Sequence, residues 1–193
     1  MTEGGAAQPL DEMIAGLAVA VPDFPVPGVV FQDLTPVFAH PVAFRRMVEG
    51  LTVPQNGDPR AAAVAGDAGP GFDVVVGVEA RGFLLAAAIA LATGVGVVPV
   101  RKAGKLPRAA LSADYALEYG TATLELHADA LRPGQRVLLV DDVLATGGTL
   151  AASSALVEQL GAVVTCVSVV IELSALGGRQ RVAPHPVHAL WTA

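Results

Sequence analysis

The sequence predicts an α/β fold in which a central parallel sheet is flanked by helices. Two short valine-rich runs, residues 73–78 and 137–140, have the length and composition of strands that are buried on both faces. Each run is followed by a turn and then by an alanine-rich segment that we expect to be helical, starting near Phe83 and Leu150. A strand that leads through a turn into a helix is the repeating unit of open parallel sheets.

The length and composition favour one domain that spans residues 1–193. The net charge of −6 argues against nucleic acid or an anionic membrane as a main partner. An anionic ligand would therefore be held by local cations and backbone N–H groups, against the overall field. Cys166 is the only cysteine, which excludes an internal disulfide, and its apolar neighbours favour a buried thiol.

The sequence predicts neither a signal peptide nor a membrane span. Residues 1–12 lack a basic region followed by an apolar one. Residues 83–100 carry no charge, but Thr93, Gly94, Gly96 and Pro99 interrupt them. A helix, a turn and a strand therefore explain this segment better than a continuous span of about 20 apolar residues. We expect a soluble, cytoplasmic protein.

The remaining elements follow from apolar spacing and from turn residues. Helices are expected over residues 9–21 and 41–51, and the proline-rich residues 21–38 should form no regular element. Residues 52–72 contain no residue pattern that indicates a functional site. Residues 106–120 have no clear hydrophobic periodicity, which suggests a mobile arm. Further strands are expected at residues 95–100, 121–126, 163–173 and 187–191.

The most informative stretch is residues 137–149, where an acidic pair and a turn of small residues follow a strand. Glycine lets the backbone approach a ligand closely, and the free N–H groups of the turn and of the next helix attract an anion such as phosphate. The threonine hydroxyls add donors, whereas Asp141 and Asp142 suit neutral hydroxyls or a metal ion. A ribose 5-phosphate offers both a phosphate and a diol.

An ordinary strand-to-helix turn with an acidic start is the alternative explanation of residues 137–149. The string is longer and more particular than a lone glycine pattern, which favours the ligand site. The chain has neither a GxGxxG motif nor a Walker A lysine at this point, which argues against a dinucleotide and a nucleoside triphosphate.

Two further charged groups lie at the ends of predicted strands. Glu79 and Arg81 follow the first valine-rich run, where a parallel sheet binds ligands, although an ion pair on the surface is the alternative. Arg101, Lys102 and Lys105 follow the next strand. Three cations within five residues of an acidic protein suggest a polyphosphate site, and a solvated surface run is the alternative.

The proline-rich loop and the histidines carry weaker information. Phe31 in this loop could stack on a flat ring, and a loop packed by its own aromatic side chains is the alternative. The four histidines show no metal-ligand spacing, so we expect no metal site built from them.

Several motifs together resemble the adenine branch of the type I phosphoribosyltransferase family. In chain order they are FPVPGVVFQDLTPVF, GVEARGF, RKAGKLP, YALEYGTATLELHADAL and VLLVDDVLATGGT. The resemblance covers about residues 20–175. It implies a type I phosphoribosyltransferase fold with a small N-terminal hood at residues 9–40 and a mobile β-lid at residues 103–126.

The resemblance also implies a reaction, which belongs to purine salvage. The enzyme would transfer ribose 5-phosphate from 5-phosphoribosyl 1-pyrophosphate (PRPP) to N9 of adenine and release AMP and pyrophosphate. Mg²⁺ would be required and bound mainly through the pyrophosphate, and the enzyme would be a homodimer.

The resemblance assigns roles to individual residues. The ribose hydroxyls would be held by Asp141 and Asp142, and the 5-phosphate would be cradled by Ala145, Thr146, Gly147, Gly148 and Thr149. Pyrophosphate would contact Glu79, Ala80 and Arg81, which lie on a turn that in this family often has a cis peptide bond without proline. It would also contact Arg101, Lys102 and Lys105, and Arg101 could reach it across a dimer interface. The adenine ring would lie between Phe31 and Val143, with its edge read by the backbone of Val30 and Gln32. Glu118 would transfer a proton at the base, and Tyr119 would help to close the lid over the leaving group.

This chain departs from the family pattern at three places. Ala80 stands where serine is common, so a hydroxyl contact is lost there, and Gln32 stands where some members have arginine. Residues 52–72 form an insertion without a counterpart. Three other functions are possible alternatives. A transferase for a 6-oxopurine is disfavoured by the LEYG lid motif, and a PRPP sensor that binds nucleic acid should carry an extra DNA-binding domain or a basic face. A plain interaction module would leave the ordered motifs unexplained.

Overall fold

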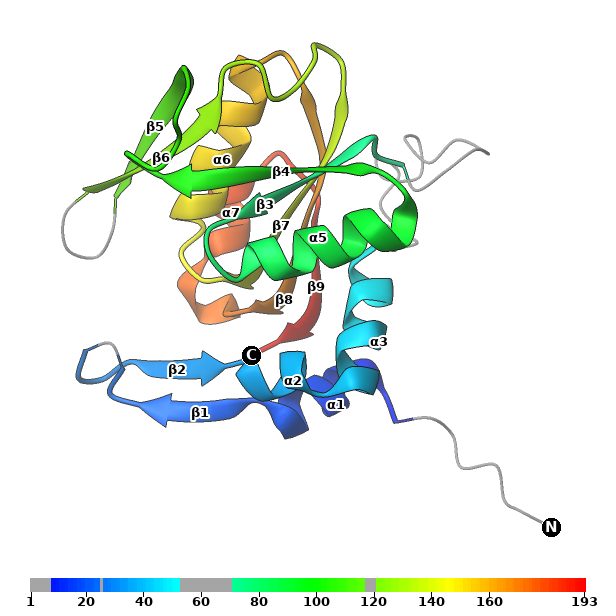
Figure 1. The fold of residues 1–193 in the computed structure, drawn as a ribbon. Coiled ribbons are helices and arrows are strands. Elements are labelled where there is room, and N and C mark those ends of the chain that lie inside the picture. The colour runs from blue at the N-terminus through cyan, green and yellow to red at the C-terminus, as the bar shows by residue number, and fades with distance from the viewer. Residues whose placement is uncertain (1–7, 25, 53–70, 117–120) are drawn as a thin grey trace. The chain divides into compact units, whose positions relative to one another are not determined.

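The computed structural model describes residues 8–24, 26–52, 71–116 and 121–193 (Figure 1). The chain divides into two compact units, Met1–Met47 and Val48–Ala193, and each unit is described by itself. Most of the predicted insertion at residues 52–72 lies outside the described residues, and so do Glu118 and Tyr119 of the predicted lid.

The first unit contains an antiparallel β-hairpin between helices. Its elements are α1 (Leu10–Leu17), β1 (Val19–Pro22), β2 (Val30–Asp33), α2 (Thr35–Ala39) and the first part of α3 (Pro41–Thr52). The helix predicted at residues 41–51 is confirmed by α3. The predicted helix at residues 9–21 is confirmed from Leu10 to Leu17, but its extension to residue 21 is wrong. The chain becomes extended at Ala18, and the β-branched Val19 and Val21 pair with β2.

The expectation that residues 21–38 form no regular element is also wrong. Val21 pairs with Phe31 in the hairpin, and α2 begins at Thr35. Pro36 lies in the first turn of α2, where the missing N–H leaves no helical hydrogen bond unmade. Proline is therefore compatible with a helix at this position.

A seven-stranded sheet forms the centre of the second unit, in the order β5-β6-β4-β3-β7-β8-β9. Its strands are β3 (Val74–Val78), β4 (Gly96–Lys102), β5 (Ala110–Ala116), β6 (Thr121–His127), β7 (Arg136–Leu144), β8 (Val163–Glu172) and β9 (Val187–Thr192). The ladders that join β4, β3, β7, β8 and β9 are parallel, whereas β6 pairs antiparallel with both β4 and β5. The predicted parallel sheet is confirmed. β5 is a regular strand within residues 106–120, where the sequence shows no clear hydrophobic periodicity.

Helices cover both faces of this sheet. The two large helices are α5 (Gly82–Thr93) and α6 (Gly148–Gln159), one on each face (Figure 1). The 3₁₀ turn η1 (Ser174–Leu176) and α7 (Gly178–Val182) follow β8. On one face, alternate β3 side chains such as Val76 pack in a core with Leu150 and Leu156 of α6. On the other face α5 approaches so closely that a Cβ on Gly77 would lie 2.6 Å from the Ala86 Cβ. Both central strands are thus buried on both faces, as predicted.

Two polar side chains of the sheet hold the last turn of α3. Ser168 and His188 are partners across the β8–β9 ladder. The Ser168 hydroxyl donates to the Leu51 carbonyl at 3.0 Å, and His188 Nε2 lies 3.0 Å from the Gly50 carbonyl oxygen. These contacts satisfy carbonyl groups that a helix end leaves without intrahelical partners.

Cys166 is partly exposed on β8 rather than buried, because its side chain does not belong to the core that neighbouring valines form. Among the described residues, no helix is long and apolar enough to cross a membrane.

Candidate active site

The candidate active site lies where the central strands β3 and β7 end. The two strands are parallel neighbours, with Gly77 opposite Val140, so the turns that follow them meet at one edge of the sheet. Gly82, the first residue of α5, joins the two turns closely. A Cβ at this position would lie 2.8 Å from the Val140 oxygen and 3.0 Å from Asp141 Oδ1, so only glycine fits there without a shift.

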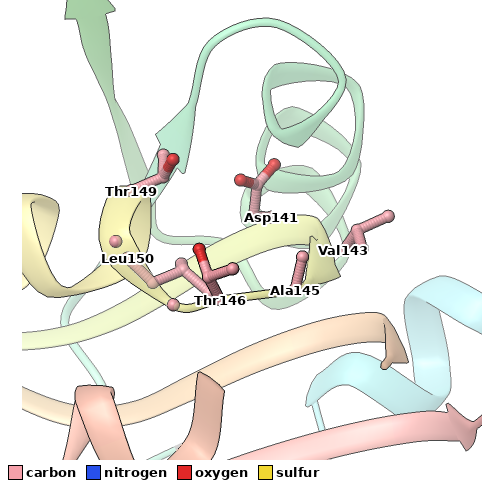
Figure 2. Close-up of a pocket in the computed structure, with 8 residues that line it drawn as sticks. Asp141, Val143, Ala145, Thr146, Thr149 and Leu150 are labelled. Carbon is pink, nitrogen blue, oxygen red and sulfur yellow. The ribbon is translucent and has the colours of Figure 1, made fainter. Parts of the chain in front are cut away.

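The turn after β7 forms a small polar pocket of about 80 Å³. Its lining residues are Asp141, Val143, Ala145, Thr146, Gly147, Gly148, Thr149 and Leu150. Figure 2 shows the Thr146 and Thr149 hydroxyls and the Asp141 carboxyl on the same side of the loop. Gly147 has φ of +78° and α6 begins at the next residue, so the first N–H groups of α6 are free to bind an anion. The predicted phosphate cradle and Asp141 are therefore brought together.

The acidic pair lies within β7 rather than after it. The strand continues to Leu144, and both carboxylates are buried. The Asp142 carboxylate forms a close ion pair with Arg81 Nε, and the Asp142 N–H donates to Asp141 Oδ1 at 2.9 Å. Burial first, and then the negative charge of Asp142, raise the pKa of Asp141 well above its usual range.

The turn after β3 gathers the predicted cationic residues around one carboxylate. Glu79 accepts a close hydrogen bond from Lys105 Nζ, one of 2.9 Å from the Lys102 N–H, and one of 3.4 Å from Arg101 Nε. Burial by itself would raise the pKa of Glu79, but these donors and the two positive charges lower it below its usual value. The Glu79–Ala80 peptide bond is cis, as the family resemblance implies.

Comparison with known proteins identifies the family. A model of the phosphoribosyl transferase domain matches residues 60–185. An adenine phosphoribosyltransferase of Salinispora arenicola is 54% identical over 189 residues, which make up 98% of this chain and 94% of that protein. The chain belongs to the adenine phosphoribosyltransferase family. The predicted family and its type I fold are confirmed.

Solved structures of adenine phosphoribosyltransferases have the same fold. The Rhodothermus marinus protein is 43% identical and superposes with a TM-score of 0.83 over 95% of this chain and 98% of that one. The Saccharomyces cerevisiae protein, solved in complex with an imino-altritol bisphosphate and adenine, is 38% identical, with a TM-score of 0.84 over 94% of this chain and 98% of that one.

The base-binding residues expected for an adenine phosphoribosyltransferase fall in two units. Val30, Phe31 and Gln32 lie in β2 of the first unit, where Phe31 stacks edge to face on Phe24 with ring centroids 5.3 Å apart. Val143 lines the pocket in the second unit. The adenine site therefore stays a prediction. Among the described residues, no three His, Cys, Asp or Glu side chains group in a way that could hold a metal ion.

Gly178 is a part of the site that sequence reasoning missed. The sequence motifs assign no role to Gly178, but Gly178 begins α7 and packs against the turn after β7 that contains Ala145 and Gly147. A Cβ on Gly178 would lie 2.2 Å from the Ala145 oxygen, and a Cβ on Gly147 would lie 2.6 Å from the Gly178 oxygen. A pair of glycines just after a strand was the one available signal for this close backbone contact.

Proposed function

We propose that this protein transfers the 5-phosphoribosyl group of PRPP to N9 of adenine and forms AMP and pyrophosphate, a reaction of purine salvage. The observation that carries the proposal is the meeting of a phosphate pocket, an acidic pair and a cationic turn at one edge of the sheet. PRPP carries a phosphate, a diol and a pyrophosphate in this order. The adenine in the yeast structure and the 9-deazaadenine in the Giardia lamblia structure support the choice of base.

Each part of the site has a chemical role in this reaction. The 5-phosphate would accept hydrogen bonds from the N-terminus of α6 and from the Thr146 and Thr149 hydroxyls. Asp141 and Asp142 would accept hydrogen bonds from the ribose hydroxyls. Departure of pyrophosphate leaves positive charge on the ribose C1, and cations close to the leaving group stabilise its negative charge.

We infer that Arg81, Arg101 and Lys105 supply that positive charge. Arg81 is held beside the acidic pair by its ion pair with Asp142. Arg101 is anchored over the Phe83 ring, with its guanidinium carbon 5.9 Å from the ring centroid. These contacts hold Arg81 and Arg101 near the site before a substrate arrives.

We also propose that Mg²⁺ takes part and is bound mainly through the pyrophosphate of the substrate. Mg²⁺ commonly uses one or two carboxylates together with substrate phosphates. The chain offers the acidic pair for the ribose end, with Asp142 already paired with Arg81, so the pyrophosphate would supply the remaining oxygen ligands. The ion would neutralise part of the leaving group's charge.

On the base side, the proposal rests on the family motifs. Adenine would stack between Phe31 and Val143, its edge would contact the backbone of Val30 and Gln32, and Glu118 would exchange the proton at the base. Tyr119 would help to close the lid, which would keep water from hydrolysing PRPP.

We propose a homodimer in the cytoplasm. α5 has no charged side chain, and Leu84 and Leu91 lie one above the other on its outer face, where Leu91 is 87% exposed. A second copy would cover this apolar face. Sedimentation of Leu91→Glu beside the unchanged protein tests the assembly, which should shift toward monomer.

PRPP and AMP are charged and do not cross a bilayer unaided, which supports the proposed location in the cytoplasm.

The decisive experiment measures AMP formation from PRPP, Mg²⁺ and adenine, beside hypoxanthine and guanine. Turnover with adenine alone, lowered at least about 100-fold in Glu118→Gln, would support the substrate and the proton-transfer role. Turnover with the 6-oxopurines instead would contradict the adenine site. Binding of PRPP without turnover of any base would favour a sensor.

A further inference from the structure

One carboxylate occupies the centre of the cationic cluster that is proposed to bind pyrophosphate. Glu79 accepts hydrogen bonds from Lys105 Nζ, Arg101 Nε and the Lys102 N–H. All three donors belong to residues assigned to pyrophosphate. An anion of the protein itself is therefore bound where the anionic leaving group would bind.

Glu79 is held at this place by its backbone as well as by its side chain. The Glu79 N–H donates to the Val100 oxygen at 3.0 Å, which ties the turn to the end of β4. Its side chain is 9% exposed, whereas those of Lys105 and Arg101 are 44% and 34% exposed. The cations can thus turn toward a ligand in solvent, but the carboxylate remains beside them.

A pyrophosphate that enters the cluster must take over donors that Glu79 already uses, and it must do so beside a fixed negative charge. Both effects oppose its binding, because the donor contacts are exchanged rather than gained and because like charges at close range repel. Neither effect acts on the 5-phosphate pocket, which is built from the separate turn after β7.

We propose that Glu79 is an internal counter-ion that competes with pyrophosphate for Lys105 and Arg101 and so favours release of this product. The inference deepens the proposed function and rests on it. Without Glu79 the same cations would hold pyrophosphate more tightly, and product release would become slower. The residue is thus a determinant of leaving-group affinity rather than a group that touches the reacting atoms.

Calorimetric titration with magnesium pyrophosphate tests the proposal. Glu79→Gln keeps the size and a hydrogen-bond acceptor but removes the charge. We expect its Kd for pyrophosphate to fall about three- to tenfold, the size of effect expected when two partly exposed ion pairs no longer compete. The inhibition constant of pyrophosphate against PRPP should fall by the same factor.

Two controls separate competition from other effects. Glu125→Gln removes the same charge from β6, directly opposite Arg101 in the strand register, where Glu125 accepts only a 3.0 Å hydrogen bond from the Gly104 N–H among the contacts described. Its pyrophosphate affinity should stay within about twofold of the unchanged protein. Glu79→Asp keeps the charge and should not reproduce the tightening of Glu79→Gln.

The outcomes are distinct. Equal or weaker pyrophosphate binding by Glu79→Gln, in protein that still binds ribose 5-phosphate normally and is therefore folded, would overturn the inference. Equal tightening by Glu125→Gln would also overturn it, because a general change of field would then explain the result. Failure of the unchanged protein to bind pyrophosphate at all would overturn the proposed function as well.

Discussion

Gly178→Ala is the substitution that most directly tests the role of α7 in the site. Gly178 is outside the pocket, and its backbone packs against the loop that carries the groups proposed to bind phosphate. The added Cβ would lie 2.2 Å from the Ala145 oxygen and 2.8 Å from Leu144 Cδ1. The first of these contacts is with backbone, which cannot rotate away as a side chain could.

The size of the effect follows from these distances. Ordinary contact begins near 3.4 Å, so the loop and α7 would have to separate by about 1.2 Å. Overpacking of this kind costs about 1–3 kcal/mol of unfolding free energy. A displacement of about 1 Å in groups that orient a substrate can lower the rate about 100-fold. We therefore expect kcat/KM for PRPP to fall by about that factor, while the protein remains folded.

Steady-state kinetics and urea unfolding of the same protein samples would check this. Gly96→Ala is the matched control, since its Cβ would meet only Val74 Cγ2, at 3.9 Å, and it should change neither quantity noticeably. Gly178→Ala with unchanged kinetics would refute the reasoning, because the loop would then not depend on α7. A loss of activity that only accompanies global unfolding would also count against it.

Two further predictions concern buried ionisable groups. Asp141→Asn should raise the free energy of unfolding at neutral pH, because the pKa of Asp141 is raised in the folded protein and its ionisation therefore destabilises the fold once the pH exceeds the pKa of the unfolded chain. The same substitution should weaken PRPP binding about 10- to 100-fold, the loss of a hydrogen bond to a charged group. Thermal melts and PRPP titrations measure the two effects, and a destabilised variant would contradict the first. Burial, with a smaller contribution from the charge of Arg179, lowers the pKa of His188 below 6.5, so the unfolded chain binds the proton more readily and stability should decline as pH falls below that value. Urea midpoints at about pH 7.5 and about pH 5.5 measure this, and His188→Gln should reduce the difference between them.

The parts of the fold that sequence patterns predicted are those in which composition and burial agree. The valine-rich runs became β3 and β7 because strands covered on both faces need apolar side chains at every position. The turn that contains Gly147 could be predicted to form a pocket for a similar reason, since small residues, hydroxyls and a following helix all point to one kind of ligand, an anion.

The parts that were missed depend on partners far away in the chain. Residues 19–22 fit a helical spacing, and only pairing with β2 makes them a strand. In β5, Leu111, Ala113 and Tyr115 face the core in alternation, but the small Ala113 weakens the pattern. The extension of β7 to Leu144 and the packing of Gly178 behind the loop are likewise set by contacts that no local pattern records.

The place of α7 in the chain also fixes when the phosphate loop can become rigid during synthesis. Every residue assigned to PRPP has been made once Thr149 has left the ribosome, yet the backbone behind Gly147 comes from Gly178, and β9 follows still later. Domains generally become ordered as units while the chain emerges. A nascent chain that ends between these two glycines would therefore contain the whole list of ligand-binding residues but not the support that holds their loop in shape, so the loop can take its binding shape only after Gly178 has been made.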